Sequence, residues 1–244
     1  VRADPNGESN SGETYIVFGQ SSGFGSTFNL SDIDGTNGFI LNGIAQAEDS
    51  GHAVSSAGDI NNDGYDDVIV GAPSADQPGA DNTGTAYIVY GKSGGFDTSI
   101  DLSDIDGSNG FFVQGLAAGS ALGAAVSTIG DINGDGIGDI IIGADDADTV
   151  NGANSGINYV IFGSSAGFGQ EFELSDLDGT NGFVINGEDG GDHAGISVSN
   201  AGDINADGVD DLIIGAFMAD PESGSAAGIS YVVFGSTDGF ASTI

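Results

Sequence analysis

The chain has 244 residues, which is enough for one large domain or two small ones with a buried core. It carries 37 acidic residues against only two basic ones, so its formal net charge is −35 at pH 7. This balance excludes nucleic acid and anionic lipid as partners, because both are bound mainly through Lys and Arg.

The composition also indicates the surroundings in which the protein works. There is no cysteine, so disulfides cannot hold the fold together. No apolar run approaches the ~20 residues of a membrane helix, and we expect no membrane insertion. We expect a secreted or cell-surface protein in a medium rich in salt or divalent cations, which would screen the charge. Because the chain begins at Val1 instead of Met, we expect a mature or excised segment.

A repeat of 72 residues organises the chain. The segment Tyr-Ile-Val-Phe-Gly at residues 15–19 returns in similar form at residues 87–91, 159–163 and 231–235. The segment that begins with Asp32 returns at Asp104 and Asp176. Such periodicity is typical of arrays in which each repeat is one supersecondary unit.

Each repeat consists of short strands and turns. In one period, strands are expected at residues 52–57, 67–71, 85–90 and 110–115. The 45 glycines and frequent turn residues leave little room for helix. Four antiparallel strands per repeat predict an all-β fold of β-propeller blades, with about 3.4 blades in this chain. A parallel solenoid is the competing architecture, but its repeats are usually shorter.

We expect one β-propeller-type repeat domain, or part of one, over residues 1–244. Propellers usually close with about 4–8 blades, so we favour a fragment of a longer array. Two chains completing one ring, and ends that overlap and swap, are the alternatives. The expected units are a partial blade at residues 1–46, blades at 47–118 and 119–190, and a partial blade at 191–244.

A nine-residue loop occurs once in each period, at residues 59–67, 131–139 and 203–211. Positions one, three, five and nine are Asp, Asn, Asp and Asp, and position six is the Gly that lets the turn close. With the backbone carbonyl at position seven, these groups form the hard-oxygen cage that Ca²⁺ prefers. The expected ligands of three Ca²⁺ sites are Asp59, Asn61, Asp63, Tyr65 and Asp67; Asp131, Asn133, Asp135, Ile137 and Asp139; and Asp203, Asn205, Asp207, Val209 and Asp211.

Other interpretations of these loops are weaker. An EF-hand is excluded because the twelfth position holds Val70, Ile142 and Ile214 instead of Glu, and because strands follow instead of helices. Mg²⁺ prefers fewer protein ligands. A solvated acidic turn would leave the carboxylates repelling one another within a few ångströms.

A second acidic motif recurs as Asp32, Asp34 and Asn37. These residues could form another cation site, but Asp-Gly and Asn-Gly pairs are also chosen for turn conformation, which is the interpretation we favour. The copies of the motif are Asp104, Asp106 and Asn109, and Asp176, Asp178 and Asn181.

The pattern G-x-S-x-G at residues 19–23, 91–95 and 163–167 resembles a hydrolase elbow, but no helix is expected after it. His52 and His193 are the only histidines, and we expect them to be structural. The sequence therefore predicts no catalytic activity.

The loop continues into Gly71-Ala72-Pro73, and this arrangement resembles the FG-GAP repeat of integrin α-subunit β-propellers and their bacterial relatives. The aligned "FG" positions are taken as Gly51-His52, Leu122-Gly123 and Ala194-Gly195. The resemblance covers essentially the whole chain, and the Asp-Gly-Thr-Asn-Gly-Phe segments look more like bacterial surface proteins than animal integrins.

The resemblance implies a propeller with calcium loops on one rim and a ligand-binding face opposite, typically in adhesion. We therefore expect a non-catalytic protein with a structural or adhesive role, in which Ca²⁺ makes each blade rigid. A calcium-dependent carbohydrate-binding propeller and a propeller module appended to a secreted enzyme are the alternatives. Expected partners are other copies or neighbouring blades of the same protein, a surface protein or a glycan.

Overall fold

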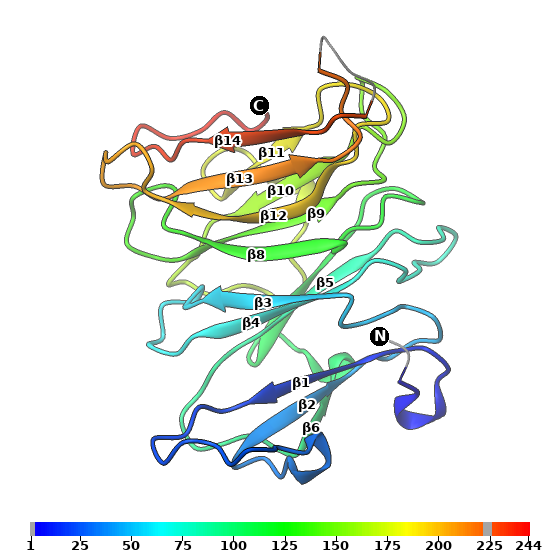
Figure 1. Cartoon of the computed structure of the whole chain (residues 1–244), viewed down its shortest axis with the longest axis vertical. Coiled ribbons are helices and arrows are strands. Elements are labelled where there is room, and N and C mark those ends of the chain that lie inside the picture. Colours follow the sequence, from blue (N-terminus) through cyan, green and yellow to red (C-terminus); the bar gives the residue numbers. More distant parts are fainter. Residues whose placement is uncertain (1–2, 222–225) are drawn as a thin grey trace.

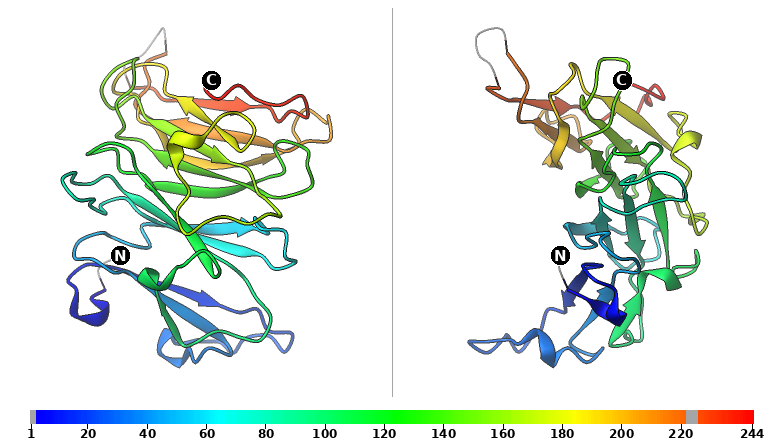
Figure 2. Two further views of the ribbon diagram at one scale, coloured as in Figure 1. Left: turned by 180° about the vertical axis from the view of Figure 1, so that it is seen from behind. Right: turned by 90° about the vertical axis from the view of Figure 1, so that its right-hand side faces the viewer.

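The computed structural model describes residues 3–221 and 226–244, and this part of the chain is all-β. It holds fourteen strands, four short 3₁₀ helices and no α-helix. Four sheets follow one another in chain order along the longest axis (Figure 1), and a side view shows them set along an arc (Figure 2). The expected all-β fold of propeller-type blades is confirmed.

Two sheets have four strands each, and in both the strands are antiparallel neighbours in chain order. One contains β3 (Ala53–Gly58), β4 (Asp67–Ala72), β5 (Thr85–Val89) and β7 (Gly110–Gln114). The next contains β8 (Ala125–Gly130), β9 (Asp139–Ala144), β10 (Ile157–Ile161) and β11 (Gly182–Asn186).

The outer two sheets have three strands each among the described residues. The first contains β1 (Glu13–Val17), β2 (Gly38–Asn42) and β6 (Ser99–Asp101), and the last contains β12 (Ala194–Gly202), β13 (Asp211–Ala216) and β14 (Ile229–Val233). The short 3₁₀ helices are η1 (Pro5–Gly7), η2 (Leu30–Asp32), η3 (Leu102–Asp104) and η4 (Leu174–Asp176). No helix in the described part of the chain has the length and hydrophobicity needed to cross a bilayer.

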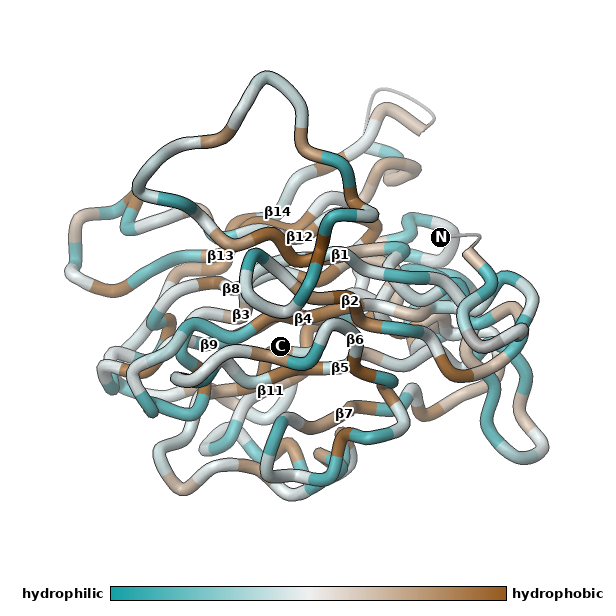
Figure 3. The backbone as a smooth tube through the Cα atoms, turned by 90° about the horizontal axis from the view of Figure 1, so that it is seen from below, coloured by the Kyte–Doolittle hydropathy of each residue, from teal (hydrophilic) through white to brown (hydrophobic). Residues whose placement is uncertain are grey.

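The hydrophobic core lies between adjacent sheets. All six residues of β9 are buried, and successive side chains of a strand point to opposite faces. Ile140 and Ile142 therefore pack in one cluster with Ile88 of the second sheet, whereas Ile141 packs in another with Leu212 of the fourth. Each fully buried side chain of this kind contributes about 1.5–3 kcal/mol. In Figure 3 the strands are largely coloured as hydrophobic, whereas most hydrophilic residues lie in the loops.

The short strand β6 is a feature that the sequence did not predict. It leaves the second repeat and pairs in parallel with β2 of the first sheet, with Leu41 opposite Ile100. The same parallel contact recurs as a single bridge between Phe112 and Glu171 and between Val184 and Thr243. The outer strands β2, β7 and β11 are thus each covered by the connection of the following repeat, which protects a sheet edge and ties neighbouring sheets together.

The glycine of the "GAP" element in one sheet contacts the glycine of the "FG" element in the next sheet. Gly51, Gly123 and Gly195 share one position and have left-handed φ angles of 83°, 90° and 102°. The expected alignment of Gly51-His52 with Leu122-Gly123 is therefore wrong by one residue, because Gly51 and not His52 is the equivalent of Gly123. A Cβ atom on Gly143 would lie against the carbonyl oxygen of Gly195 in the next sheet, so these backbones approach too closely for any side chain.

We predict that Gly143→Ala destabilises the protein by about 1–3 kcal/mol, because the added methyl group must push two sheets apart. Chemical denaturation measures the change. Gly169→Ala is the control, since a Cβ there meets only one backbone oxygen at 3.6 Å. Equal stability of the two variants would contradict the close approach.

Candidate metal centres

The three nine-residue loops connect the first and second strands of their sheets, between β3 and β4, β8 and β9, and β12 and β13. They lie on the same side of the stacked sheets, at the left in Figure 1. The structure thus brings all fifteen predicted ligand residues to one rim, in three separate groups of five.

The carboxylate at position one organises each turn. Asp59 accepts hydrogen bonds from the backbone N–H groups of Asp63 and Gly64, at 2.8 and 2.9 Å. Gly64 has a φ of 92°, a conformation that favours glycine. Asp131 and Asp203 accept the equivalent bonds in the other loops.

Positions three and five complete the turn. The side-chain oxygen Oδ1 of Asn61 accepts from the backbone N–H of Asp63 at 3.0 Å. Asp63 Oδ1 accepts from the backbone N–H of Tyr65 at 2.9 Å. The Asn61 amide also donates to Asp63 Oδ2 at 3.1 Å. The pattern repeats at Asn133 and Asp135, and at Asn205 and Asp207.

The carboxylate at position nine has a structural role that the sequence did not reveal. Asp139 is completely buried and bridges two segments, accepting from the N–H of Ile132 in the loop and of Gly163 after β10, at 3.0 and 2.9 Å. Asp67 and Asp211 make the same two bonds in their sheets. Burial raises the pKa of both Asp67 and Asp139 to about 7, although the backbone hydrogen bonds oppose the shift.

The loops also connect adjacent sheets. The Ile60 carbonyl accepts from the N–H of Ser164, which follows β10 in the next sheet, at 2.8 Å. The Ile132 carbonyl accepts from Ser236 after β14 in the same way, at 2.9 Å. Both isoleucines are fully buried. The conformation of each of these two loops therefore helps to position the following sheet.

The donor set of the loops fits a hard divalent cation. Each loop gathers three carboxylates, and no Lys or Arg within residues 3–221 and 226–244 lies at ion-pair distance from any of them. The lysine, Lys92, instead lies over the ring of Phe96, at 4.9 Å from its centroid. An all-oxygen set that includes three carboxyl groups and no cationic side chain suits Ca²⁺ well.

The carboxylates of each loop accept hydrogen bonds from backbone N–H groups, and their oxygens do not all lie within 4.8 Å of one another. In the described part of the chain, Asp145, Asp146 and His193 are the one group of three potential metal ligands whose ligand atoms all lie within 4.8 Å of one another. The three carboxylates of each loop are therefore spaced more widely than the ligand atoms of that group.

The second acidic motif forms self-contained turns. Asp34 Oδ1 accepts from both the backbone N–H and the hydroxyl of Thr36, at 2.9 and 2.6 Å. The side-chain oxygen Oδ1 of Asn37 accepts from the backbone N–H of Asp34. The Thr36 hydroxyl lowers the pKa of Asp34. Asp106 and Asp178 make the same bonds. These contacts support the turn interpretation of the motif.

The serine patterns lie in turns that follow the third strands. Residues 21–22, 93–94 and 165–166 are turns, and irregular chain follows each of them before the next 3₁₀ helix or strand. A nucleophile elbow requires a helix at this point. The geometry therefore agrees with the interpretation of these segments as connections between strands.

We predict that Asp139→Ala lowers the free energy of unfolding by about 2 kcal/mol or more in EGTA, because two buried N–H groups lose their partner. Urea denaturation measures it without any contribution from metal. Asp97→Ala is the control, since Asp97 is exposed and its carboxylate accepts no hydrogen bond from any residue within 3–221 and 226–244. A purely metal-binding role for Asp139 would leave the two variants equally stable in EGTA.

Comparison with known proteins agrees with the repeat. The FG-GAP repeat family matches residues 50–89 and 194–233, two segments that lie two periods apart. The chain is 34% identical to bovine (Bos taurus) phosphatidylinositol-glycan-specific phospholipase D over 179 residues, which is 73% of this chain and 20% of that protein.

Integrin alpha chains are also similar. Mouse (Mus musculus) integrin alpha-2 is 40% identical over 94 residues, and Caenorhabditis briggsae integrin alpha pat-2 is 38% identical over 98 residues. Each match covers 38% of this chain and 7% of the integrin. The chain thus spans a fifth or less of the length of these relatives. It carries FG-GAP repeats, and these repeats fold as blades of the β-propeller type.

Proposed function

We propose that this protein is a non-catalytic, calcium-binding β-propeller repeat protein with a structural or adhesive role outside the cell. The observation that carries the proposal is the loop that occurs three times with the same acidic positions and the same hydrogen bonds. Three uncompensated carboxylates in so short a loop favour a bound divalent cation.

The residues that would hold the ion are the five oxygen donors of each loop. When bound, Ca²⁺ would supply two positive charges that offset the repulsion among the carboxylates. Hydrogen bonds of the chain itself connect each loop to its surroundings. Asp139 links its loop to the end of β10, and the Ile132 carbonyl links the same loop to the next sheet. Ordering a loop therefore orders two sheets, and binding energy becomes folding energy.

The extracellular and adhesive parts of the proposal have separate support. A net charge of −35 suits a medium that contains abundant cations. Similarity to integrin alpha chains favours an adhesive role, although it covers little of those proteins. Similarity to a phospholipase D over a fifth of its length keeps open a module appended to a secreted enzyme.

The natural partners that we propose are neighbouring blades of the same kind. Ile60 and Ile132 are fully buried by the sheet that follows theirs, whereas the equivalent Ile204 in the last described sheet is 57% exposed. Phe234, at the end of the same sheet, is 54% exposed. A further blade stacked on this sheet would cover both residues.

A second candidate function is carbohydrate binding that depends on calcium. A groove of about 640 Å³ borders the first loop and is lined by Asn61, Asp63, Lys92 and Asp104. Such polar groups beside a calcium loop suit sugar hydroxyls. Glycan-array binding that requires Ca²⁺ and is lost in Lys92→Ala would favour this function, and a blank array would count against it.

We predict that Ca²⁺ raises the melting temperature relative to EGTA. Each occupied site adds about 2.7 kcal/mol at a free concentration of 100 times its Kd. Differential scanning calorimetry measures the shift, with Mg²⁺ at the same ionic strength as the control. Equal melting temperatures in Ca²⁺ and EGTA would defeat the proposal.

We also predict that Asp63→Ala lowers the calcium stoichiometry from three to two per chain, because the loops that begin at Asp131 and Asp203 share no ligand with it. Equilibrium dialysis measures the stoichiometry. Asp97→Ala should keep three ions. A variant at Asp63 that also keeps three would show that the loop does not bind calcium through this carboxylate.

A further inference from the structure

Both histidines of the chain lie near one buried carboxylate, on the side of the sheets away from the calcium loops. Asp145 directly follows β9 and is 7% exposed, whereas the loop that begins at Asp131 lies at the other end of that strand. His193 directly precedes β12 of the next sheet. His52 directly precedes β3 and is close enough to Asp145 to interact with it electrostatically.

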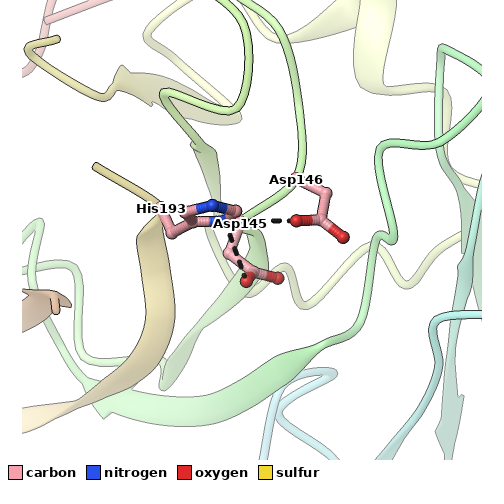
Figure 4. Close-up of side chains that lie close together, drawn as sticks. All are labelled: Asp145, Asp146 and His193. Carbon is pink, nitrogen blue, oxygen red and sulfur yellow. Dashed lines mark ion pairs between the residues drawn. The ribbon is translucent and has the colours of Figure 1, made fainter. Parts of the chain in front are cut away.

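The side chains converge between the third and fourth sheets. The Nδ1 atom of His193 lies 3.1 Å from an oxygen of Asp146 and 3.7 Å from an oxygen of Asp145 (Figure 4). One potential ligand atom from each residue lies within 4.8 Å of the others. Ligands around a tetrahedral Zn²⁺ at about 2.0–2.2 Å are about 3.3 Å from one another, and the two distances from His193 Nδ1, 3.1 and 3.7 Å, lie on either side of this spacing.

The repeat itself provides an independent comparison. In the second repeat, the positions of Asp145 and Asp146 hold Pro73 and Ser74, and the position of His193 holds Ala121 in the third repeat. The junction between the second and third sheets therefore has no metal ligand at any of the three positions. At the junction between the third and fourth sheets, all three positions hold metal-ligand types.

We propose that Asp145, Asp146 and His193 form a site for a divalent transition-metal ion of the Zn²⁺ class, which joins the third and fourth sheets. An imidazole nitrogen beside two carboxylates selects such ions over Ca²⁺ and Mg²⁺, which prefer oxygen alone. Asp146 is exposed, so an ion can enter from solvent, and water would complete the coordination. The protein would then carry oxygen-only sites on one rim and this mixed site on the other.

The test uses the whole chain with its calcium loops saturated. The protein is stripped with chelator, dialysed into excess Ca²⁺ and titrated with Zn²⁺ alone by calorimetry. We expect one Zn²⁺ per chain. His193→Ala and Asp146→Ser should each weaken binding at least tenfold, since even loss of an outer-shell partner costs 10–100-fold in affinity.

These two substitutions are chosen so that the variants fold. Ala121 already occupies the position of His193 with a φ of 55°, against 53° for His193, and Ser74 occupies that of Asp146. Their melting temperatures in Ca²⁺ without Zn²⁺ should match the parent protein. Asp97→Ala, an exposed acid in another loop, should keep the Zn²⁺ site.

A visible absorption band of bound Co²⁺ that disappears in His193→Ala would place the nitrogen ligand independently of calorimetry. The proposal is overturned if Zn²⁺ does not bind in excess Ca²⁺, or if it binds His193→Ala as tightly as the parent protein. In that case the cluster is only a contact between the His193 imidazole and the carboxylates of Asp145 and Asp146.

Discussion

The fold depends on how a chain of this acidity accommodates three carboxyl groups in each nine-residue loop. The turns achieve this by directing backbone N–H groups at them: each loop satisfies its first, third and fifth positions locally and its ninth across the sheet. Backbone N–H groups are dipoles, however, and they cannot cancel the summed charge of three carboxylates. The proposed calcium ions would complete what the hydrogen bonds begin.

The same loops explain how separate sheets become one structure. A loop carbonyl receives an N–H group from the next sheet at Ile60 and Ile132, the glycine backbones of Gly143 and Gly195 make close contact, and the connection of each repeat pairs with the previous outer strand. Isoleucines on both faces of β9 fill the space between. Each sheet is therefore stabilised mainly by its neighbours, as in other repeat architectures.

Much of this arrangement could be predicted from the sequence, because period-two strands, turn glycines and a fixed spacing are local signals. The strands around the loop at residues 59–67 fall within one or two residues of the expected positions. The parallel strand β6 could not be predicted, since its partner lies about 60 residues earlier in a turn-rich region. The structural role of Asp139 was hidden by its place in a metal motif. The contacts of His193 with Asp145 and Asp146 could not be predicted, because these residues are adjacent only in space.

The central claim is that the acidic loops bind calcium ions that stabilise the stacked sheets. The most direct measurement is a crystal structure from calcium-containing buffer, with anomalous diffraction recorded at a wavelength where Ca²⁺ scatters strongly. The account predicts one anomalous peak in each loop, coordinated by oxygens that include Asp63, Asp135 and Asp207. Loops that contain only water under these conditions would contradict it.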